Sequence, residues 1–192
     1  MCGAHLAESV RKKASKALRE QLVLPKGEHT TILVAISGGK DSAVLLERIH
    51  ENLGKRRDVT IVGGCVDEGI EGYRPPSLEC ARELCEELGI RFETVSYPEL
   101  GFKEMDEVVD KIVQLEERKA PCSYCGVFRR QGINHLANRV NADVIALGHN
   151  LDDMAQTIMM NMQNGDLERT LRLAPHTSTP LEGMVPRIVP LR

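Results

Sequence analysis

The sequence contains no tryptophan, and aromatic residues make up only 3% of its 192 residues. A core must therefore be built from Leu, Val, Ile, Ala and Met. No apolar run approaches the roughly 18 residues of a membrane-spanning helix, and no secretory signal opens the chain. No segment repeats with a period of roughly 20 to 50 residues, which argues against solenoids and propellers. We therefore expect a cytoplasmic α/β protein that does not use a membrane.

Charge is nearly balanced overall, at −3, but it is unevenly distributed. Residues 1–26 carry six Lys and Arg against two acids, and residues 67–117 carry fifteen acids against five bases. Residues 118–140 carry five Lys and Arg and no acid, and they include Cys122 and Cys125. A basic surface around a thiol pair suits a polyanionic partner. Charge counting alone favours the alternative, a solvated helix face.

Short β-branched runs alternate with helical patterns along the chain. The expected strands are 30–36, 59–66, 91–97 and 143–147, and the expected helices are 8–22, 41–53, 75–88, 102–118, 123–140 and 151–163. This alternation predicts an α/β fold, a three-layer parallel sheet with helices on both faces. Such sheets bind ligands beyond the carboxyl ends of their strands, where the strand order switches.

The first chemical signal is the hexapeptide SGGKDS at 37–42, between an expected strand and an expected helix. Its two glycines let the backbone bring amide N–H groups close to an anion, and the helix N-terminus adds its dipole. The spacing matches neither a Walker A loop nor a dinucleotide fingerprint. The hexapeptide resembles the SGGxDS pyrophosphate loop of the N-type ATP pyrophosphatases. A plain glycine-rich turn capped by Ser37 or Asp41 is the alternative.

The second signal is a Cys-x-x-Cys pair, Cys122 and Cys125, at an expected helix start. Such a pair can hold an edge of a metal site or cluster, or act as a redox couple. Cys2 and His5 form a Cys-x-x-His pair that would complete a Cys₃His zinc site. That site ranks below an iron–sulfur cluster, because nothing in the sequence brings the two pairs together. A reduced pair without metal is the alternative.

The third signal is GHNLDD at 148–153, which follows an expected strand. Carboxylates at this edge of the sheet would hold Mg²⁺ against phosphate oxygens. In the alternative interpretation, Asn150 caps the next helix and Asp152 complements its dipole. A phosphate loop at the same edge favours the magnesium interpretation.

Six ordered segments resemble those of the archaeal and eukaryotic cytosolic tRNA wobble-uridine 2-thiolation enzymes. They are VAISGGKDS, VDEGIEGYRPPSLE, VSYPEL, MDEVV, CSYCGVFRRQ and GHNLDDMAQTIMMNMQNGDLER. The resemblance covers nearly the whole chain and implies an ATP pyrophosphatase fold of the adenine nucleotide alpha hydrolase type. It implies ATP-dependent replacement of the C2 oxygen of uridine 34 by sulfur, in tRNAs for Lys, Glu and Gln. It also implies a sulfur donor protein or sulfide, and a homodimer or a paralogous subunit.

The resemblance further implies roles for individual residues. The catalytic residues would be Lys40, Asp41, Cys122 and Cys125. ATP, with Mg²⁺, would contact Ala35, Ser37, Gly38, Gly39, Lys40, Asp41, Ser42, Cys65, Arg129, Gly148 and Asp153. Cys122 and Cys125 match two of the three cysteines that hold a [4Fe–4S] cluster in the family. Sulfide would come from the cluster's unique iron or from a cysteine persulfide, and the sequence does not choose between these routes.

The resemblance is incomplete at both ends of the chain. The family's third cluster cysteine falls beyond Arg192, and neither Cys80 nor Cys85 matches it. Residues 1–5 match only the second half of an N-terminal zinc finger, so Zn²⁺ is expected at most on a partial site of Cys2 and His5. We therefore expect a basic helix with a zinc-finger remnant in 1–27. Residues 28–192 would form a PP-loop catalytic domain that lacks its C-terminal segment.

Two other functions fit parts of the sequence. An ATP pyrophosphatase acting on a small molecule would leave the Cys122 pair and its basic surroundings without a role. A non-enzymatic subunit that binds tRNA or nucleotide would have no need of the intact phosphate loop.

Overall fold

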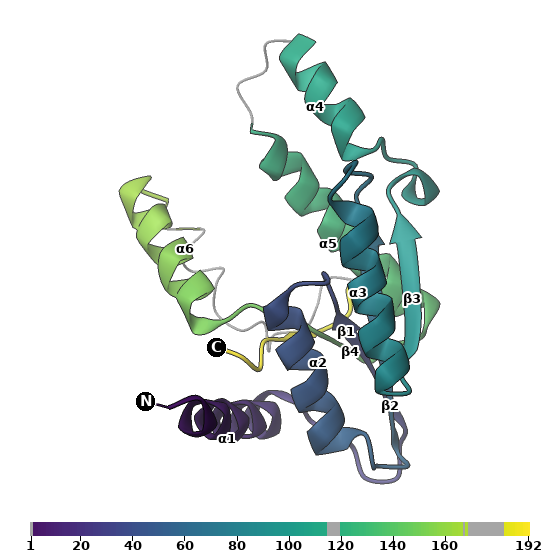
Figure 1. Ribbon diagram of the computed structural model, residues 1–192, viewed down its shortest axis with the longest axis vertical. Helices are drawn as coiled ribbons and strands as arrows, with labels where there is room; N and C mark the ends of the chain where they lie inside the picture. Colours follow the sequence, from purple (N-terminus) through teal and green to yellow (C-terminus); the bar gives the residue numbers. More distant parts are fainter. Residues whose placement is uncertain (1, 115–119, 167, 169–182) are drawn as a thin grey trace.

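One parallel sheet of five strands organises the chain in the computed structural model, which describes residues 2–114, 120–166, 168 and 183–192 (Figure 1). The strand order is β3-β2-β1-β4-β5, and every pairing is parallel. The strands are β1 Thr30–Ala35, β2 Val59–Asp67, β3 Arg91–Ser96, β4 Val144–Ala146 and β5 Arg187–Ile188. The order switches between β1 and β4, so a ligand site is expected where these two strands end.

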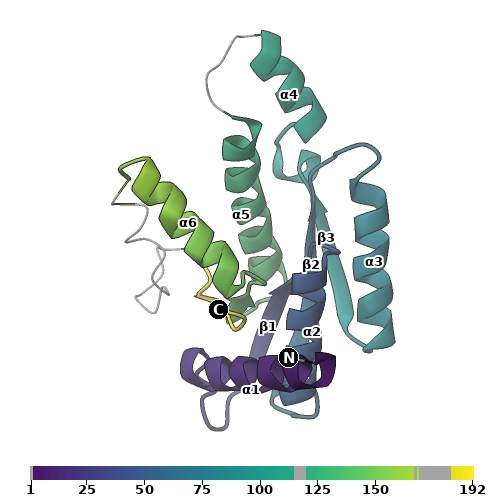
Figure 2. The ribbon, with the colours of Figure 1, turned by 60° about the vertical axis from the view of Figure 1, so that its left-hand side comes forward.

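Helices cover both faces of the sheet, which confirms the predicted three layers (Figure 2). The helices are α1 Gly3–Gln21, α2 Lys40–Leu53, α3 Arg74–Glu87, α4 Met105–Gln114, α5 Pro121–Arg139 and α6 Leu151–Gln163, with the short 3₁₀ helix η1 at Pro98–Leu100. Helices α1, α2 and α3 pack on one face, and α5 packs on the other. Among the described residues, no helix has the length and apolarity needed to cross a membrane.

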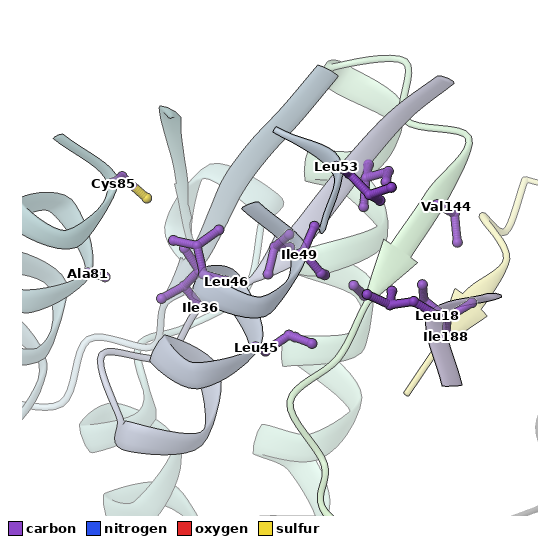
Figure 3. Close-up of a cluster of buried hydrophobic side chains, with 13 residues drawn as sticks. Leu18, Ile36, Leu45, Leu46, Ile49, Leu53, Ala81, Cys85, Val144 and Ile188 are labelled. Carbon is purple, nitrogen blue, oxygen red and sulfur yellow. The ribbon is translucent and has the colours of Figure 1, made fainter. Parts of the chain in front are cut away.

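Strand β1 is the centre of the core, because its side chains alternate between the two faces. Ile32 and Val34 belong to the cluster under α1, α2 and α3. The same cluster contains Leu45 and Leu46 of α2 (Figure 3). Leu33 points into the second cluster, under α5. Full burial of each such side chain contributes about 1.5–3 kcal/mol, so this strand is firmly anchored and fixes the loop that follows it.

The N-terminal helix shares the first of these clusters. Leu18 is buried in it, and the Ser15 hydroxyl donates to Asn52 Oδ1 of α2 at 2.8 Å. Gln21 exchanges two hydrogen bonds with the backbone of Val189. A boundary at residue 27 stays a prediction, and α1 packs on the sheet domain as one of its helices.

Three elements differ from those expected. Helix α1 begins at Gly3 rather than at residue 8. The helix expected from residue 102 begins at Met105, because Pro98 starts η1 and Gly101 closes it at a φ of 79°. Its expected end at 115–118 lies outside the described residues. Strand β5 was not predicted, since its two residues carry no periodic pattern.

Candidate nucleotide and thiol site

The hexapeptide 37–42 joins β1 to α2 and includes the first three residues of that helix. The Ser42 hydroxyl donates to Gly39 O at 2.8 Å and accepts from Ser37 N at 3.2 Å. Gly39 is the N-cap of α2 and no side chain caps that helix, so amide N–H groups of its first turn are left to bind an anion. In that first turn Lys40 is exposed and Asp41 is half-buried. The loop has the geometry of an anion cradle.

Gly38 is fixed by both its backbone conformation and its neighbour. Its φ is 81°, and a Cβ added there would lie 2.1 Å from the carbonyl oxygen of Ser77 in α3. The first turn of α3 is therefore the wall behind the loop. Arg74, the first residue of α3, donates from Nη1 to the carbonyl oxygen of Ser37 at 3.3 Å. Only glycine fits at position 38.

The segment 148–153 adjoins this loop, as its place after β4 predicts. A Cβ on Gly148 would lie 3.2 Å from Ser42 Cα, so the β4 loop touches the first turn of α2. Asn150 Oδ1 accepts from Asp153 N at 2.9 Å, and Asp153 Oδ2 accepts from Asn150 N at 3.0 Å. This capping box confirms that Asn150 caps α6. Contact of Asp153 with ATP and magnesium binding stay predictions.

The thiol pair lies in the first turns of α5, with Cys122 exposed and Cys125 half-buried. Arg129 Nη2 lies 3.4 Å from Cys125 Sγ, and the Tyr97 hydroxyl lies 3.4 Å from the same sulfur and donates to Cys125 O at 3.2 Å. Tyr97 is fully buried, its ring edge-on to Phe128, and burial raises its pKa far above the usual value. Cys125 Sγ therefore has a guanidinium and a buried hydroxyl as neighbours.

A buried acid links this pair to the loop. Glu68 is 3% exposed and accepts from Arg129 Nε at 2.9 Å. Burial opposes the charge of Arg129, but the Glu68 carboxylate together with the neighbouring Cys125 and Tyr97 outweighs burial and raises the pKa of the guanidinium. The other carboxylate oxygen lies 2.7 Å from Arg74 Nε. Phosphate loop and thiol pair are therefore ends of one connected set of polar groups.

Comparison with known proteins agrees with this geometry. The sequence model of the PP-loop domain family matches residues 6–187. The chain belongs to the PP-loop family. It is 39% identical over 176 residues to tRNA 2-thiolation protein NcsA of Haloferax volcanii, which covers 90% of this chain and 54% of that protein. It is 39% identical over 165 residues to cytoplasmic tRNA 2-thiolation protein 1 of Danio rerio, which covers 84% of this chain and 47% of that protein.

A solved structure resembles the PP-loop chain over almost its full length. The U34-tRNA thiolase NcsA from Methanococcus maripaludis, solved with its [4Fe-4S] cluster, superposes with a TM-score of 0.81 at 34% identity. The match covers 99% of this chain and 60% of that chain. This chain thus spans about half the length of the curated relatives it matches.

The donor set for a cluster at the thiol pair is partial. Cys122 and Cys125 supply two thiols from one helical face, three residues apart. Across the described ranges, no group of three or more His, Cys, Asp or Glu side chains is placed to hold a metal ion. The described residues therefore fit two corners of a [4Fe–4S] cluster and not a complete set.

The N-terminal pair lies apart from this site. Cys2 Sγ lies 3.1 Å from His5 Nδ1 at the start of α1. The start of α1 and the start of α5 lie at opposite ends of the PP-loop domain (Figures 1 and 2). A Cys₃His zinc site built from both pairs is therefore wrong, because the sheet separates them. A partial zinc site at Cys2 and His5 stays a prediction.

Cys65 is buried at the end of β2, where its sulfur accepts from Arg74 Nη2 at 2.8 Å. Burial, partly offset by Arg74, raises the pKa of its thiol to about 11. Burial likewise raises the pKa of Cys85 to about 11. Both thiols are therefore protonated and poor nucleophiles near neutral pH. Contact of Cys65 with adenine stays a prediction.

The basic residues of 118–140 divide into distinct environments. Arg118 and Lys119 lie outside the described residues. Arg139 donates to Glu93 Oε2 and to Thr94 O, both at 2.7 Å, so its charge is already paired. Arg130 is exposed, and Arg187 Nη2 lies 3.5 Å from Arg130 O. Neither Arg130 nor Arg187 forms an ion pair with any carboxylate of the described residues, and burial and then Arg130 lower the pKa of Arg187.

Sequence reasoning missed Glu68 and Arg74. Both stand in VDEGIEGYRPP, directly after β2, where a buried strand ends at the expected ligand edge. An acid and an arginine flanking two glycines at that place were the available signal. Their burial results from the packing of α3 against the loop, and this packing cannot be predicted from the local sequence.

Proposed function

We propose that this PP-loop chain uses ATP to activate the C2 oxygen of wobble uridine 34 in tRNA and then replaces that oxygen by sulfur. One observation carries the proposal: a continuous set of contacts joins Ser37 of the phosphate loop to Cys125 through Arg74, Glu68 and Arg129. An ATP pyrophosphatase that does not transfer sulfur would not require a cysteine thiol at the far end of this chain of contacts. The likeness to tRNA 2-thiolation proteins supports the same function.

In the activation step, the loop binds the β and γ phosphates of ATP through its amide N–H groups. Lys40, exposed at the start of α2, supplies the positive charge that offsets charge growing on the leaving pyrophosphate. Mg²⁺, held by phosphate and carboxylates of 148–153, would add to this neutralisation. The uracil C2 oxygen attacks the α-phosphorus, the bond to the bridging oxygen breaks, and pyrophosphate leaves.

In the sulfur step, a sulfide equivalent forms a bond to ring carbon C2, and the C2–O bond breaks to release AMP. Cys125 lies beside the guanidinium of Arg129, and Cys122 is exposed one turn away. These two thiols would hold two corners of the cluster, which would supply the iron that binds sulfide. The sulfide comes from free sulfide or from a donor protein.

The substrate tRNA is proposed to meet the outer side of α5 and β5. Arg130 and Arg187, which have no carboxylate partner among the described residues, are its proposed phosphate contacts. The tRNAs would be those for Lys, Glu and Gln. A cytoplasmic location and a homodimer or paralogous pair are part of the same proposal, as is an N-terminal segment at 1–27 preceding a PP-loop domain at 28–192.

The deciding experiment measures pyrophosphate release with and without tRNA, and 2-thiouridine in tRNA nucleosides by mass spectrometry. Release that depends on tRNA, with 2-thiouridine formed when sulfide is supplied, supports the function. Release with small molecules but not with tRNA would assign a different substrate. ATP binding without any release would make the chain a binding subunit. Loss of 2-thiouridine in a deletion strain is the matching test in cells.

A further inference from the structure

One buried carboxylate joins two arginines that come from opposite faces of the sheet. Glu68 is 3% exposed and Arg74 is 4% exposed. Glu68 Oε2 lies 2.7 Å from Arg74 Nε on α3, and Oε1 accepts from Arg129 Nε on α5 at 2.9 Å. Helices α3 and α5 cover different faces of the sheet (Figure 2). The carboxylate therefore ties the two helical layers together beyond the end of β2.

The remaining nitrogens of Arg74 hold the start of the phosphate loop. Nη1 donates to Ser37 O and to Ser77 Oγ, both at 3.3 Å. Nη2 donates to Cys65 Sγ at 2.8 Å and to the carbonyl oxygen of Val66. Ser37 is the first residue of the loop, so one side chain fixes both that residue and the end of β2. A planar fork of five donors suits this task, and a lysine does not match it.

The contact between Glu68 and Arg74 is an ion pair and not a well-directed hydrogen bond. Arg74 Nε and Glu68 Oε2 have no hydrogen-bond partner among the described residues although they lie 2.7 Å apart. Two guanidiniums share one carboxylate, which leaves an excess positive charge beside the Cys125 sulfur. Removing the carboxylate would leave Arg74 buried without a counterion and facing Arg129. Buried ion pairs add little stability compared with apolar packing, so this arrangement points to a role in geometry.

We propose that Glu68 and Arg74 are positioning residues, which hold the first peptide of the phosphate loop and the Cys125 end of α5 in a fixed relation. Arg74 acts on the loop through Ser37, and Glu68 acts on the thiol through Arg129. The inference rests on the proposed function, because it places ATP on the loop and sulfur chemistry at Cys125. It adds two residues that contact neither the nucleotide nor the reacting sulfur.

The chain offers a matched control for Glu68. Glu93 on β3 also receives two arginines, Arg91 Nε at 2.8 Å and Arg139 Nη2 at 2.7 Å, and Arg139 belongs to α5 as well. It lies away from the loop and the thiol pair. Glu93→Gln therefore makes the same chemical change as Glu68→Gln. Val95→Ala, at a buried position of the cluster under α5, controls for a general loss of stability.

The experiment measures three quantities on the whole chain: the Kd for ATP by calorimetry, the rate of Cys125 alkylation by iodoacetamide, and the unfolding midpoint. Glu68→Gln should raise the Kd about tenfold or more and change the alkylation rate about fivefold, since misplacement of a site by about 1 Å costs that much or more. Glu93→Gln should leave both within about twofold, because rim ion pairs contribute little.

Arg74→Lys separates positioning from stability. The lysine keeps one charge for Glu68 but cannot also reach Ser37 and Cys65, so ATP binding should weaken while Cys125 alkylation stays near wild type. This variant also carries the test if Glu68→Gln does not fold. The inference is overturned if Glu68→Gln behaves as Glu93→Gln does, or if Val95→Ala shifts the ATP affinity equally at the same loss of stability. If the wild type does not bind ATP, the proposed function is overturned as well. If the wild type thiolates tRNA while Glu68→Gln and Arg74→Lys keep the wild-type Kd for ATP and the wild-type alkylation rate, only the inference is overturned.

Discussion

At the scale of single residues, the phosphate loop depends on side chains with separate tasks. Ser42 closes the loop by two hydrogen bonds, and Gly38 lets α3 approach it. Lys40 makes no ion pair with the described residues and is exposed, so its charge is available to an anion. Structure and chemistry are therefore divided between neighbours, and substitutions can separate them.

Lys40→Ala should abolish tRNA-dependent pyrophosphate release while the fold persists. Removal of one preorganised charge contact costs about 3–4 kcal/mol of transition-state stabilisation, a loss of several hundredfold in rate. Lys55→Ala, a change at an exposed lysine just after α2, is the control. Wild-type release by the Lys40 variant would contradict the role given to the loop.

Gly38→Ala should prevent ATP binding, since its Cβ would meet the backbone of Ser77 at 2.1 Å. Gly89→Ala is the control, because Gly89 also has a positive φ, 65°, but no atom within 4 Å of an added Cβ. The control should lose only about 1–2 kcal/mol of stability, from the left-handed backbone. Calorimetry with ATP and thermal unfolding distinguish the two. Equal ATP affinity in both variants would show that α3 moves enough to accommodate the added Cβ at position 38.

At the scale of elements, α5 carries functions on opposite sides. Its inner residues Ile133 and Leu136 pack under the sheet. Its first turns carry the thiols, Arg139 near its end pairs with Glu93, and Arg130 meets β5. Of the three arginines of the helix, Arg129 and Arg139 are already paired with Glu68 and Glu93, and Arg130 has no carboxylate partner among the described residues.

The double variant Arg130→Gln, Arg187→Gln should flatten the slope of log K for tRNA binding against log salt by roughly one to two units. Arg139→Gln should leave the slope near wild type, because Glu93 already neutralises that charge. Filter binding over a salt series gives both slopes. An unchanged slope in the double variant would indicate that Arg130 lies on a solvated helix face and does not contact tRNA phosphates.

Elements with strong local patterns were predictable, and those fixed by distant contacts were not. The β-branched run of β1 ending in Gly-Gly indicated a buried strand and a phosphate loop, and both are present. Strand β5 lies between two prolines and forms because the backbone N–H groups of Ile145 and Leu147 donate to it. A strand of two residues has no pattern of its own from which this pairing could be predicted. The Glu68–Arg74 ion pair could not be predicted, because it is buried by segments that are distant in the sequence.

At the scale of the whole molecule, most of the residues expected to contact ATP and the thiol pair lie on different elements. The residues matched to ATP contacts lie between Ala35 and Asp153, and most of them surround the switch between β1 and β4. The thiols lie farther out, at the start of α5. Loss of a thiol should therefore leave the nucleotide site intact.

The 192-residue chain should bind ATP yet hold iron weakly, since two described thiolates occupy only part of a [4Fe–4S] cluster. After anaerobic reconstitution, chelators and oxygen should strip the iron quickly. Cys122→Ser should change the iron content and leave the Kd for ATP within about twofold, because the groups act separately. Iron analysis and ATP titration on the same samples test this. Stoichiometric, chelator-resistant iron would reveal a further ligand.

The contact between Tyr97 and Cys125 makes this protein its own optical probe. Without tryptophan, its intrinsic fluorescence is tyrosine emission alone, from three residues. Tyr73 is 63% exposed, whereas Tyr97 is fully buried with its hydroxyl 3.4 Å from the Cys125 sulfur. An iron–sulfur cluster held there would absorb in the near ultraviolet and would quench Tyr97 by energy transfer. Loading and loss of a cluster would thus change the tyrosine emission, and the part of that change missing in Tyr97→Phe would report on the surroundings of Cys125 with no added dye.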